Sequence, residues 1–123
     1  MQYEYIINNE NKTINVLTIG NLEAGELAAM GLEIMMKAKE LKYKIIFDFR
    51  LSKNKVSIGE AYFWFSMHYD KIDIEFRHIP TVYIVNKDDW DFYSFFECTC
   101  INRGIPIKVF LDENGVLKWL ERI

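Results

Sequence analysis

Hydrophobic and polar residues alternate at the start of the chain. Tyr3, Tyr5 and Ile7 alternate with the residues between them, which is the two-residue period of a strand with one buried face. Residues 13–19 form a second apolar segment rich in β-branched side chains. The Asn-rich segment 8–12 between them has the composition of a turn, because Asn tolerates left-handed backbone. Together these features predict an antiparallel hairpin.

The next segment has helical periodicity. Gly20 and Asn21 predict a strand break and a helix cap. The apolar residues that follow recur on one helical face, at Leu27, Met30, Ile34, Ala38 and Leu41. Gly31 lies near that face and costs helix stability, so we expect it to allow close packing against a sheet.

The rest of the chain alternates apolar strands with capped helices. Runs of consecutive apolar positions, typical of strands buried on both faces, lie within 44–50, 79–85 and 105–111. Helices are predicted from Ser57 to about Tyr69, from Asp88-Asp89 to about Asn102, and from Asp112 to Leu120. This order predicts an α/β fold of residues 1–123 as one domain, with an N-terminal antiparallel hairpin joined to a mostly parallel five-stranded sheet and about four helices.

Three segments carry a resemblance to a known family. The strand Ile45–Arg50 ends in acidic and basic residues, and Ile79–Val85 forms the next strand. The strand Ile107–Leu111 is followed by Asp112 and then by Trp119-Leu120. This order over nearly the whole chain resembles STAS domains, found in sulfate transporters and anti-sigma-factor antagonists, and in particular the SpoIIAA-like subgroup. The resemblance implies a regulatory or ligand-binding module rather than a catalyst.

Ser57 is the candidate switch residue that the resemblance suggests. In switch-type STAS proteins, a serine at the start of the helix after the central strand is phosphorylated within an Asp-Ser-Ser-Gly or Asp-Ser-Thr-Gly motif. Residues 48–59 lack that motif, and Ser57 alone matches by position. Ser57 and Glu60 also fit a capping box. Ser57 is therefore interpreted either as a plain helix cap or as a switch and partner-binding residue.

Polar residues follow the predicted central strands. They are Asp48, Arg50, Asn86 and Asp88. Ligands of open α/β sheets bind outside the carboxyl ends of the strands, so these side chains are candidates for holding a polar ligand head. The alternative is that they cap helices and pair with one another.

The aromatic helix after Ser57 has more apolar residues than one packed face needs. Helical spacing predicts that Ile58, Tyr62, Phe65 and Tyr69 face the core. Phe63 and Met67 then lie on the far side, as a candidate partner-binding surface. The helix near residues 90–96 is also apolar on more than one face. Wide core packing, an oligomer interface and a lipophilic pocket between the helices all account for this pattern.

Composition and charge exclude several functions. The chain of 123 residues is 50% hydrophobic with a net charge of −3, so nothing indicates a surface for nucleic acid. Its apolar runs are far shorter than the ~20 residues of a membrane span. The N-terminal residues lack the pattern of a signal peptide, so we expect a cytoplasmic protein.

Catalytic and metal-binding patterns are weak. Cys98, Cys100, His68 and His78 are possible metal ligands, but helical residues two apart point in different directions, so buried cysteines and surface histidines are the better interpretation. The sequence contains no Gly-x-Ser-x-Gly elbow and no phosphate loop. We therefore expect neither an enzyme nor a cofactor or metal site. The hypotheses are a protein-interaction module with a protein partner or a homodimer, and alternatively a module for a small lipophilic or nucleotide-like ligand.

Overall fold

A computed structural model describes the backbone of residues 1–68 and 74–123, and the side chains of these residues except 64–66 and 68. The strands are β1 (Gln2–Asn8), β2 (Thr13–Leu22), β3 (Lys44–Asp48), β4 (Ser52–Asn54), β5 (Thr81–Ile84) and β6 (Ile107–Phe110). The helices are α1 (Ala24–Leu41), α2 (Ile58–His68), α3 (Ile74–Arg77), α4 (Trp90–Ile101) and α5 (Val116–Glu121), with a 3₁₀ turn η2 (Lys87–Asp89).

The sheet has the mixed topology that the sequence predicts. Its strand order is β1-β2-β3-β5-β6, and β4 pairs with the end of β2. The β1–β2 pair is antiparallel, with Tyr5 opposite Val16, and the other pairs are parallel. The predicted α/β class, the hairpin and the mostly parallel sheet are therefore confirmed. The described residues contain one more strand and one more helix than expected, namely the short elements β4 and α3.

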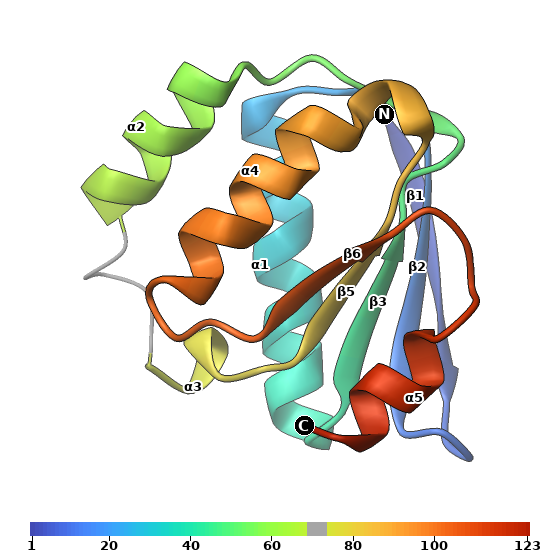
Figure 1. Cartoon of the computed structure of the whole chain (residues 1–123). Coiled ribbons are helices and arrows are strands. Elements are labelled where there is room, and N and C mark those ends of the chain that lie inside the picture. Colours follow the sequence, from blue (N-terminus) through green and yellow to red (C-terminus); the bar gives the residue numbers. More distant parts are fainter. Residues whose placement is uncertain (69–73) are drawn as a thin grey trace.

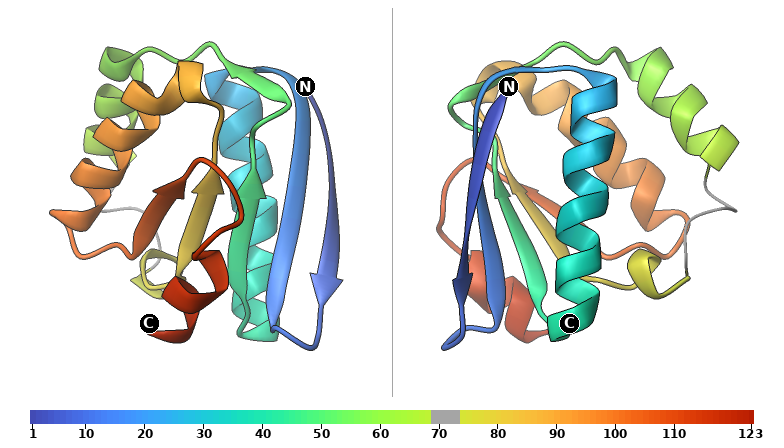
Figure 2. Two further views of the ribbon diagram at one scale, coloured as in Figure 1. Left: turned by 45° about the vertical axis from the view of Figure 1, so that its right-hand side comes forward. Right: turned by 180° about the vertical axis from the view of Figure 1, so that it is seen from behind.

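Helices cover both faces of the sheet (Figure 1). One core cluster joins α1 residues such as Ile34 to Val16, Phe47 and the α4 residue Tyr93, so α1 and α4 lie on the same face. A second cluster joins Val116 and Leu120 of α5 to β3 and β5 on the opposite face. Figure 2 shows α2 beyond α4, farther from the sheet than α1 and α4.

The apolar stripe of α1 is confirmed, but its predicted start is wrong. Met30, Ile34 and Ala38 are buried. The helix begins at Ala24, whereas Gly20 and Asn21 still belong to β2. The reason is pairing with β4, in which Gly20 lies opposite Ser52 and Asn21 opposite Lys53, so the backbone stays extended.

The predicted start of the third helix is right and that of the last helix is shifted. α4 begins at Trp90 with Asp89 in the N-cap position, although the Asp89 side chain makes no capping hydrogen bond. Asn86, rather than Asp88, accepts a hydrogen bond from the Asp89 amide at 3.0 Å, and this contact caps the 3₁₀ turn that precedes α4. The Asp112 carboxylate accepts from the Asn114 amide at 2.8 Å and so forms a turn before α5 begins at Val116. In both places the acidic side chain lies in a turn that precedes the helix.

At the β6 edge of the sheet, a side chain accepts a hydrogen bond from the backbone. The Glu97 carboxylate of α4 accepts a hydrogen bond from the Val109 amide at 2.9 Å. Lys108 lies 3.6 Å from the same carboxylate group and pairs with it. An amide at this edge, which no further strand bonds, is thereby satisfied within the chain.

Candidate functional site

A cavity of about 220 Å³ lies between the sheet and the helices that cover its α1 and α4 face. Strand and loop residues that line it include Phe47, Phe49, Val56, Ile79, Thr81, Tyr83, Ile105 and Ile107. Helical residues that line it include Ala24, Leu27, Ala28, Met30, Gly31, Met35, Glu60, Ala61, Phe76, Arg77, Phe92, Tyr93, Phe96 and Cys100. Most of these side chains are apolar, so the cavity suits an apolar molecule.

Aromatic rings form the sheet and α4 side of the cavity. The Phe49 ring stacks on Phe47 at 5.4 Å and on Tyr93 at 5.5 Å between ring centroids. Tyr83 lies 5.4 Å from Phe49 and 6.0 Å from Phe96. The alternation of β3 places Phe47 on this face, and Phe49 continues it one residue beyond the strand end. These rings form a contiguous aromatic wall.

Small residues of α1 leave room on the other side. Ala24, Ala28 and Gly31 are spaced so that they share one helical face, and all three line the cavity. The predicted close packing of Gly31 against the sheet is wrong, because a Cβ added there would meet no neighbouring atom within 4 Å. The space beside Gly31 belongs to the cavity.

The cavity reaches the surface near the first turns of α1 and α2. Ala24 and Glu60 both line it and are exposed, and Ala61 beside Glu60 is half-buried. The Glu60 carboxylate is occupied in capping α2, so it lies at the opening as part of a helix terminus. Arg77 of α3 also lines the cavity and carries a positive charge.

Tyr93 places a buried hydroxyl in the cavity wall. The residue is only 2% exposed, and its hydroxyl oxygen has no hydrogen-bond partner among the residues that the structure describes. Burial raises its pKa, and the neighbouring Tyr83 and Asp89 raise it further, so the phenol keeps its proton. Burial also raises the pKa of Tyr83, and it raises the pKa of the Cys100 thiol to about 12. All three groups are therefore neutral at physiological pH.

Ser57 forms the predicted capping box. Its hydroxyl accepts a hydrogen bond from the Glu60 amide at 3.1 Å, and the Glu60 carboxylate accepts from the Ser57 amide at 3.1 Å. Both residues are exposed. The helix-cap role of Ser57 is thus present in the structure, and the role in switching stays a hypothesis.

The side chains on the two sides of α2 differ less in solvent exposure than the periodicity predicts. Phe63 and Met67 are 68% and 55% exposed, as expected for the far side of the helix. Ile58 and Tyr62 are 44% and 52% exposed, so the prediction that they belong to the core is wrong. The prediction assumed that α2 packs against the sheet, whereas α2 lies beyond α4 (Figure 2). The side chain of Phe65 and all of Tyr69 lie outside the described residues.

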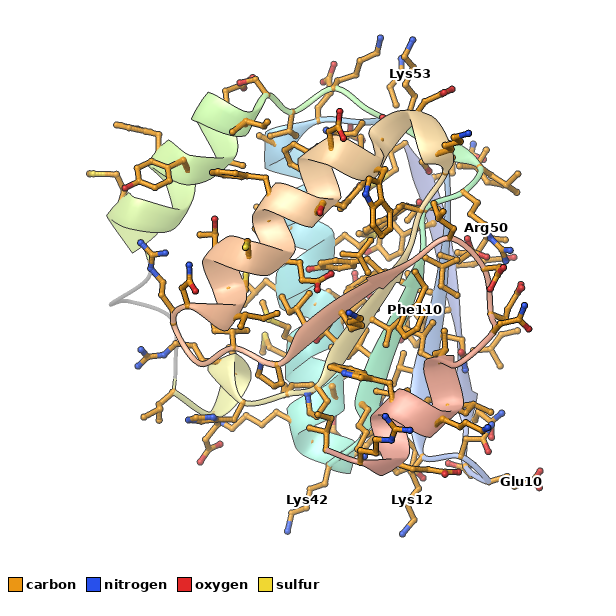
Figure 3. All side chains as sticks on the ribbon, in the orientation of Figure 1. Glu10, Lys12, Lys42, Arg50, Lys53 and Phe110 are labelled. Atoms are coloured by element: carbon orange, nitrogen blue, oxygen red, sulfur yellow. The ribbon has the colours of Figure 1, made fainter. Side chains whose placement is uncertain are left out.

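The predicted strand-end residues Asp48 and Arg50 bind each other. Arg50 Nη2 lies 2.8 Å from one Asp48 carboxylate oxygen, Arg50 Nε lies 3.0 Å from the other, and Arg50 also pairs with Glu113. Partial burial acts to raise the pKa of Asp48, but the hydrogen bonds from Arg50 outweigh it and hold that pKa below its usual value. Figure 3 shows Arg50 near the loop that leads from β6 to α5, on the opposite end of the sheet from Lys12 and Lys42.

The other two strand-end candidates make contacts different from those of that pair. The Asn86 amide donates to the Ser52 carbonyl at 2.9 Å, so it joins the end of β5 to β4. Asp88 is exposed within the 3₁₀ turn. None of Asp48, Arg50, Asn86 and Asp88 lines the cavity, so the structure does not bring the strand-end set and the aromatic helices into one site.

The cysteines and histidines are dispersed. Cys100 is buried and Cys98 is exposed, so the expectation of buried cysteines is right for the first and wrong for the second. His78 is exposed, and the side chain of His68 is outside the described residues. Among the residues that the structure describes, no three His, Cys, Asp or Glu side chains form a group that could hold a metal ion. The helices of the described residues include none with the length and apolarity of a membrane span.

Comparison with known proteins adds no assignment. No family model matches the chain. No curated protein matches it. No solved structure matches it either.

Proposed function

We propose that this protein binds a small lipophilic molecule in the cavity between the sheet, α1, α2 and α4. The observation that carries the proposal is the apolar cavity of about 220 Å³. Protein interiors pack as densely as organic crystals, with few voids larger than a water molecule. Because the cavity opens to the surface, water would contact its apolar wall, and a bound apolar molecule would remove that wall from water.

The wall chemistry supports a lipophilic ligand over a nucleotide-like one. A nucleotide needs several charge-assisted contacts for its phosphates. The described part of the cavity wall consists mainly of aromatic and aliphatic residues, and among the described lining residues only Glu60 and Arg77 carry charge. The volume exceeds the roughly 150 Å³ of an apolar cavity that holds benzene, so a ring with a small substituent fits.

Substitution of Gly31 tests the proposal. Gly31→Leu places an aliphatic side chain in the space beside α1, so we expect binding of α-methylstyrene, measured by isothermal titration calorimetry, to weaken at least tenfold. Gly25→Leu is the matched control, because Gly25 lies on the same helix with no atom within 4 Å of an added Cβ but outside the cavity. Equal affinity in wild type and Gly31→Leu would refute the proposal, and so would the absence of binding by wild-type protein.

A second candidate function is protein association through α2, with another copy of this chain as the partner tested. It is favoured by the exposure of Ile58, Tyr62, Phe63 and Met67 on one helix. Large apolar side chains gathered on a surface commonly mark an interface. Native mass spectrometry of the purified protein separates the two functions, since a dimer without added mass supports association and a bound small molecule supports the cavity. Truncation of Phe63 and Met67 to Ala should dissolve a dimer built on α2, and a dimer that persists excludes this surface.

A further inference from the structure

The strand β1 leaves one edge of the sheet open. It is the first strand in the order β1-β2-β3-β5-β6, and Figure 2 shows it on the outside of the sheet. Half of the backbone amides and carbonyls of an edge strand point away from its neighbour. Among the residues that the structure describes, none outside β2 forms a backbone–backbone hydrogen bond with residues 2–8. The outward groups of β1 are therefore available to another strand.

β1 lacks the features that usually protect a free edge. Its pairing with β2 runs without a bulge from Gln2 to Asn8. Residues 2–8 contain neither Pro nor Lys, and Glu4 is their only charged residue. Edge strands that stay in water commonly carry such residues, a bulge or a covering element. The β6 edge differs, because the Glu97 carboxylate there accepts a hydrogen bond from a strand amide. A regular and nearly uncharged edge such as β1 is the type that pairs with another chain.

The side chains of β1 add apolar surface to this open edge. Tyr3 and Tyr5 are 36% and 37% exposed, and Ile6 is 70% exposed. The Tyr3 hydroxyl donates a hydrogen bond to Glu33 of α1, so Tyr3 lies on the α1 face of the sheet. Strand alternation puts Tyr5 and Ile7 on the same face. Two aromatic rings and an isoleucine therefore line the edge on that face.

The sequence of β1 is complementary to itself in an antiparallel pair. Pairing all seven residues places Tyr5 opposite the same residue of a second copy, with a two-fold axis between them. Tyr3 then lies opposite Ile7 of the second copy, which is a favourable aromatic and β-branched pair. On the other face Glu4 lies opposite Ile6 of the second copy. The two Glu4 side chains are diagonal neighbours, about 7–8 Å apart, so no like charges lie directly opposite each other.

We propose that two copies of this chain associate through β1, in antiparallel pairing centred on Tyr5, so that one sheet runs through both copies. This two-fold pairing uses the open edge of each copy, so the assembly closes at two copies. The surface is separate from the cavity and from α2, because no residue of β1 belongs to either. The inference therefore goes beyond the proposed ligand binding and does not depend on it.

Opposite charges at residue 5 test the pairing. Tyr5→Lys and Tyr5→Glu each place like charges directly opposite each other across the two-fold axis, which destabilises a strand pair. We expect either variant to raise the dimer dissociation constant at least tenfold in sedimentation velocity over a dilution series. An equimolar mixture of the two variants should form heterodimers about as tight as the wild-type dimer, because opposite charges then face each other. Native mass spectrometry identifies the heterodimer by its mass.

Ile6→Lys is the matched control for the register. Ile6 is more exposed than Tyr5, but a lysine in its place lies opposite Glu4 of the second copy. We therefore expect the Ile6→Lys dimer to be at least as tight as that of wild type. A loss of affinity as large as that of Tyr5→Lys would contradict pairing centred on Tyr5.

The remaining outcomes also decide the inference. Monomeric wild-type protein would overturn it, and so would assemblies that grow beyond two copies. A dimer that Tyr5→Lys leaves intact but that truncation of Phe63 and Met67 dissolves would assign the interface to α2 instead. Because Tyr5 and Ile6 are not buried, each variant should keep the urea midpoint of the wild-type monomer. Failure of the mixed variants to form a heterodimer would overturn the two-fold contact at residue 5.

Discussion

The two faces of the sheet are packed in different ways. On the α5 face, Val116 and Leu120 lie in one buried cluster with Ile46, Val82 and Ile84. On the α1 and α4 face, a larger core cluster surrounds the cavity. The short helix α5 is anchored by the buried side chains of Val116 and Leu120, whereas the longer helix α1 presents small residues where it meets the cavity.

The difference separates two uses of apolar surface. Burial of aliphatic side chains on the α5 face stabilises the chain by about 25 cal/mol per Å² of surface removed from water. On the other face, the cavity lies between the aromatic residues of the sheet and α4 and the small residues of α1. We infer that the α5 face serves stability and the α1 and α4 face serves binding. Substitutions on each side test this division.

The largest effect is expected on the α5 face. Leu120→Ala removes a buried side chain and leaves a void, so we expect the free energy of unfolding to fall by about 3 kcal/mol in urea titrations. Leu117 lies on the same helix but is about half exposed, and Leu117→Ala should change the value by less than about 0.5 kcal/mol. Similar losses in both variants would mean that α5 does not pack as described.

A smaller effect is expected where α2 begins. Ser57→Ala removes the hydroxyl that caps α2, which should cost about 1 kcal/mol locally. We expect amide hydrogen exchange at Glu60 and Ala61 to become about fivefold faster. Ser57→Asp keeps an acceptor at a helix N-terminus and should exchange as wild type does. Both variants could instead change the binding of partners or probes without any change in amide exchange at Glu60 and Ala61. That result would show that Ser57 acts as more than a cap.

A stabilising change is expected at Gly31. Gly31→Ala improves helix propensity and meets no neighbouring atom, so the free energy of unfolding should rise by about 0.8 kcal/mol. Gly25→Ala tests the same propensity outside the cavity, although its position in the first turn of α1 reduces the gain. A destabilised Gly31→Ala variant would contradict the open space beside this residue.

The smallest effect is expected at the Asp48–Arg50 pair, which also holds Glu113 ahead of α5. Asp48 has a lowered pKa in the folded chain, so its contribution is present above its unfolded pKa of about 3.9 and is lost as pH falls further. We expect Asp48→Asn to lower the free energy of unfolding by about 0.5 kcal/mol at pH 7. In urea titrations the difference from wild type should shrink as pH falls below about 4, and a constant difference would exclude the ion pair as its cause.

Local patterns predict the elements that local forces determine. The strand at residues 2–8, the stripe of α1 and the capping box at Ser57 each depend on neighbours within a few positions, and each is confirmed. The buried face predicted for that strand is wrong at Tyr3 and Tyr5, which are 36% and 37% exposed. β4 has only three residues, so no alternation marks it, and its pairing with β2 depends on residues more than 30 positions away. The prediction that Ile58 and Tyr62 are buried was wrong for the same reason. Which element packs against a helix face depends on tertiary contacts, which local spacing does not determine.

The cavity was anticipated only as one of three explanations for the aromatic helices. Phe92 and Phe96 of α4 do line it, together with sheet residues that the pattern assigned simply to the core. A periodic sequence pattern shows which apolar side chains face the core, but it does not show where space is left between them. The available signal was the spacing of Ala24, Ala28 and Gly31 on one helical face, which puts three small residues where a packed helix usually carries large ones.

The Glu97 contact at the β6 edge has a consequence for how the protein behaves at high concentration. The segment around β6 is an apolar stretch of high β-propensity, the type of sequence that joins strands of other molecules into fibrils. The Glu97 carboxylate occupies the Val109 amide that such a strand would bond. The contact therefore leaves one fewer free amide at this sheet edge for a strand of another molecule to bond.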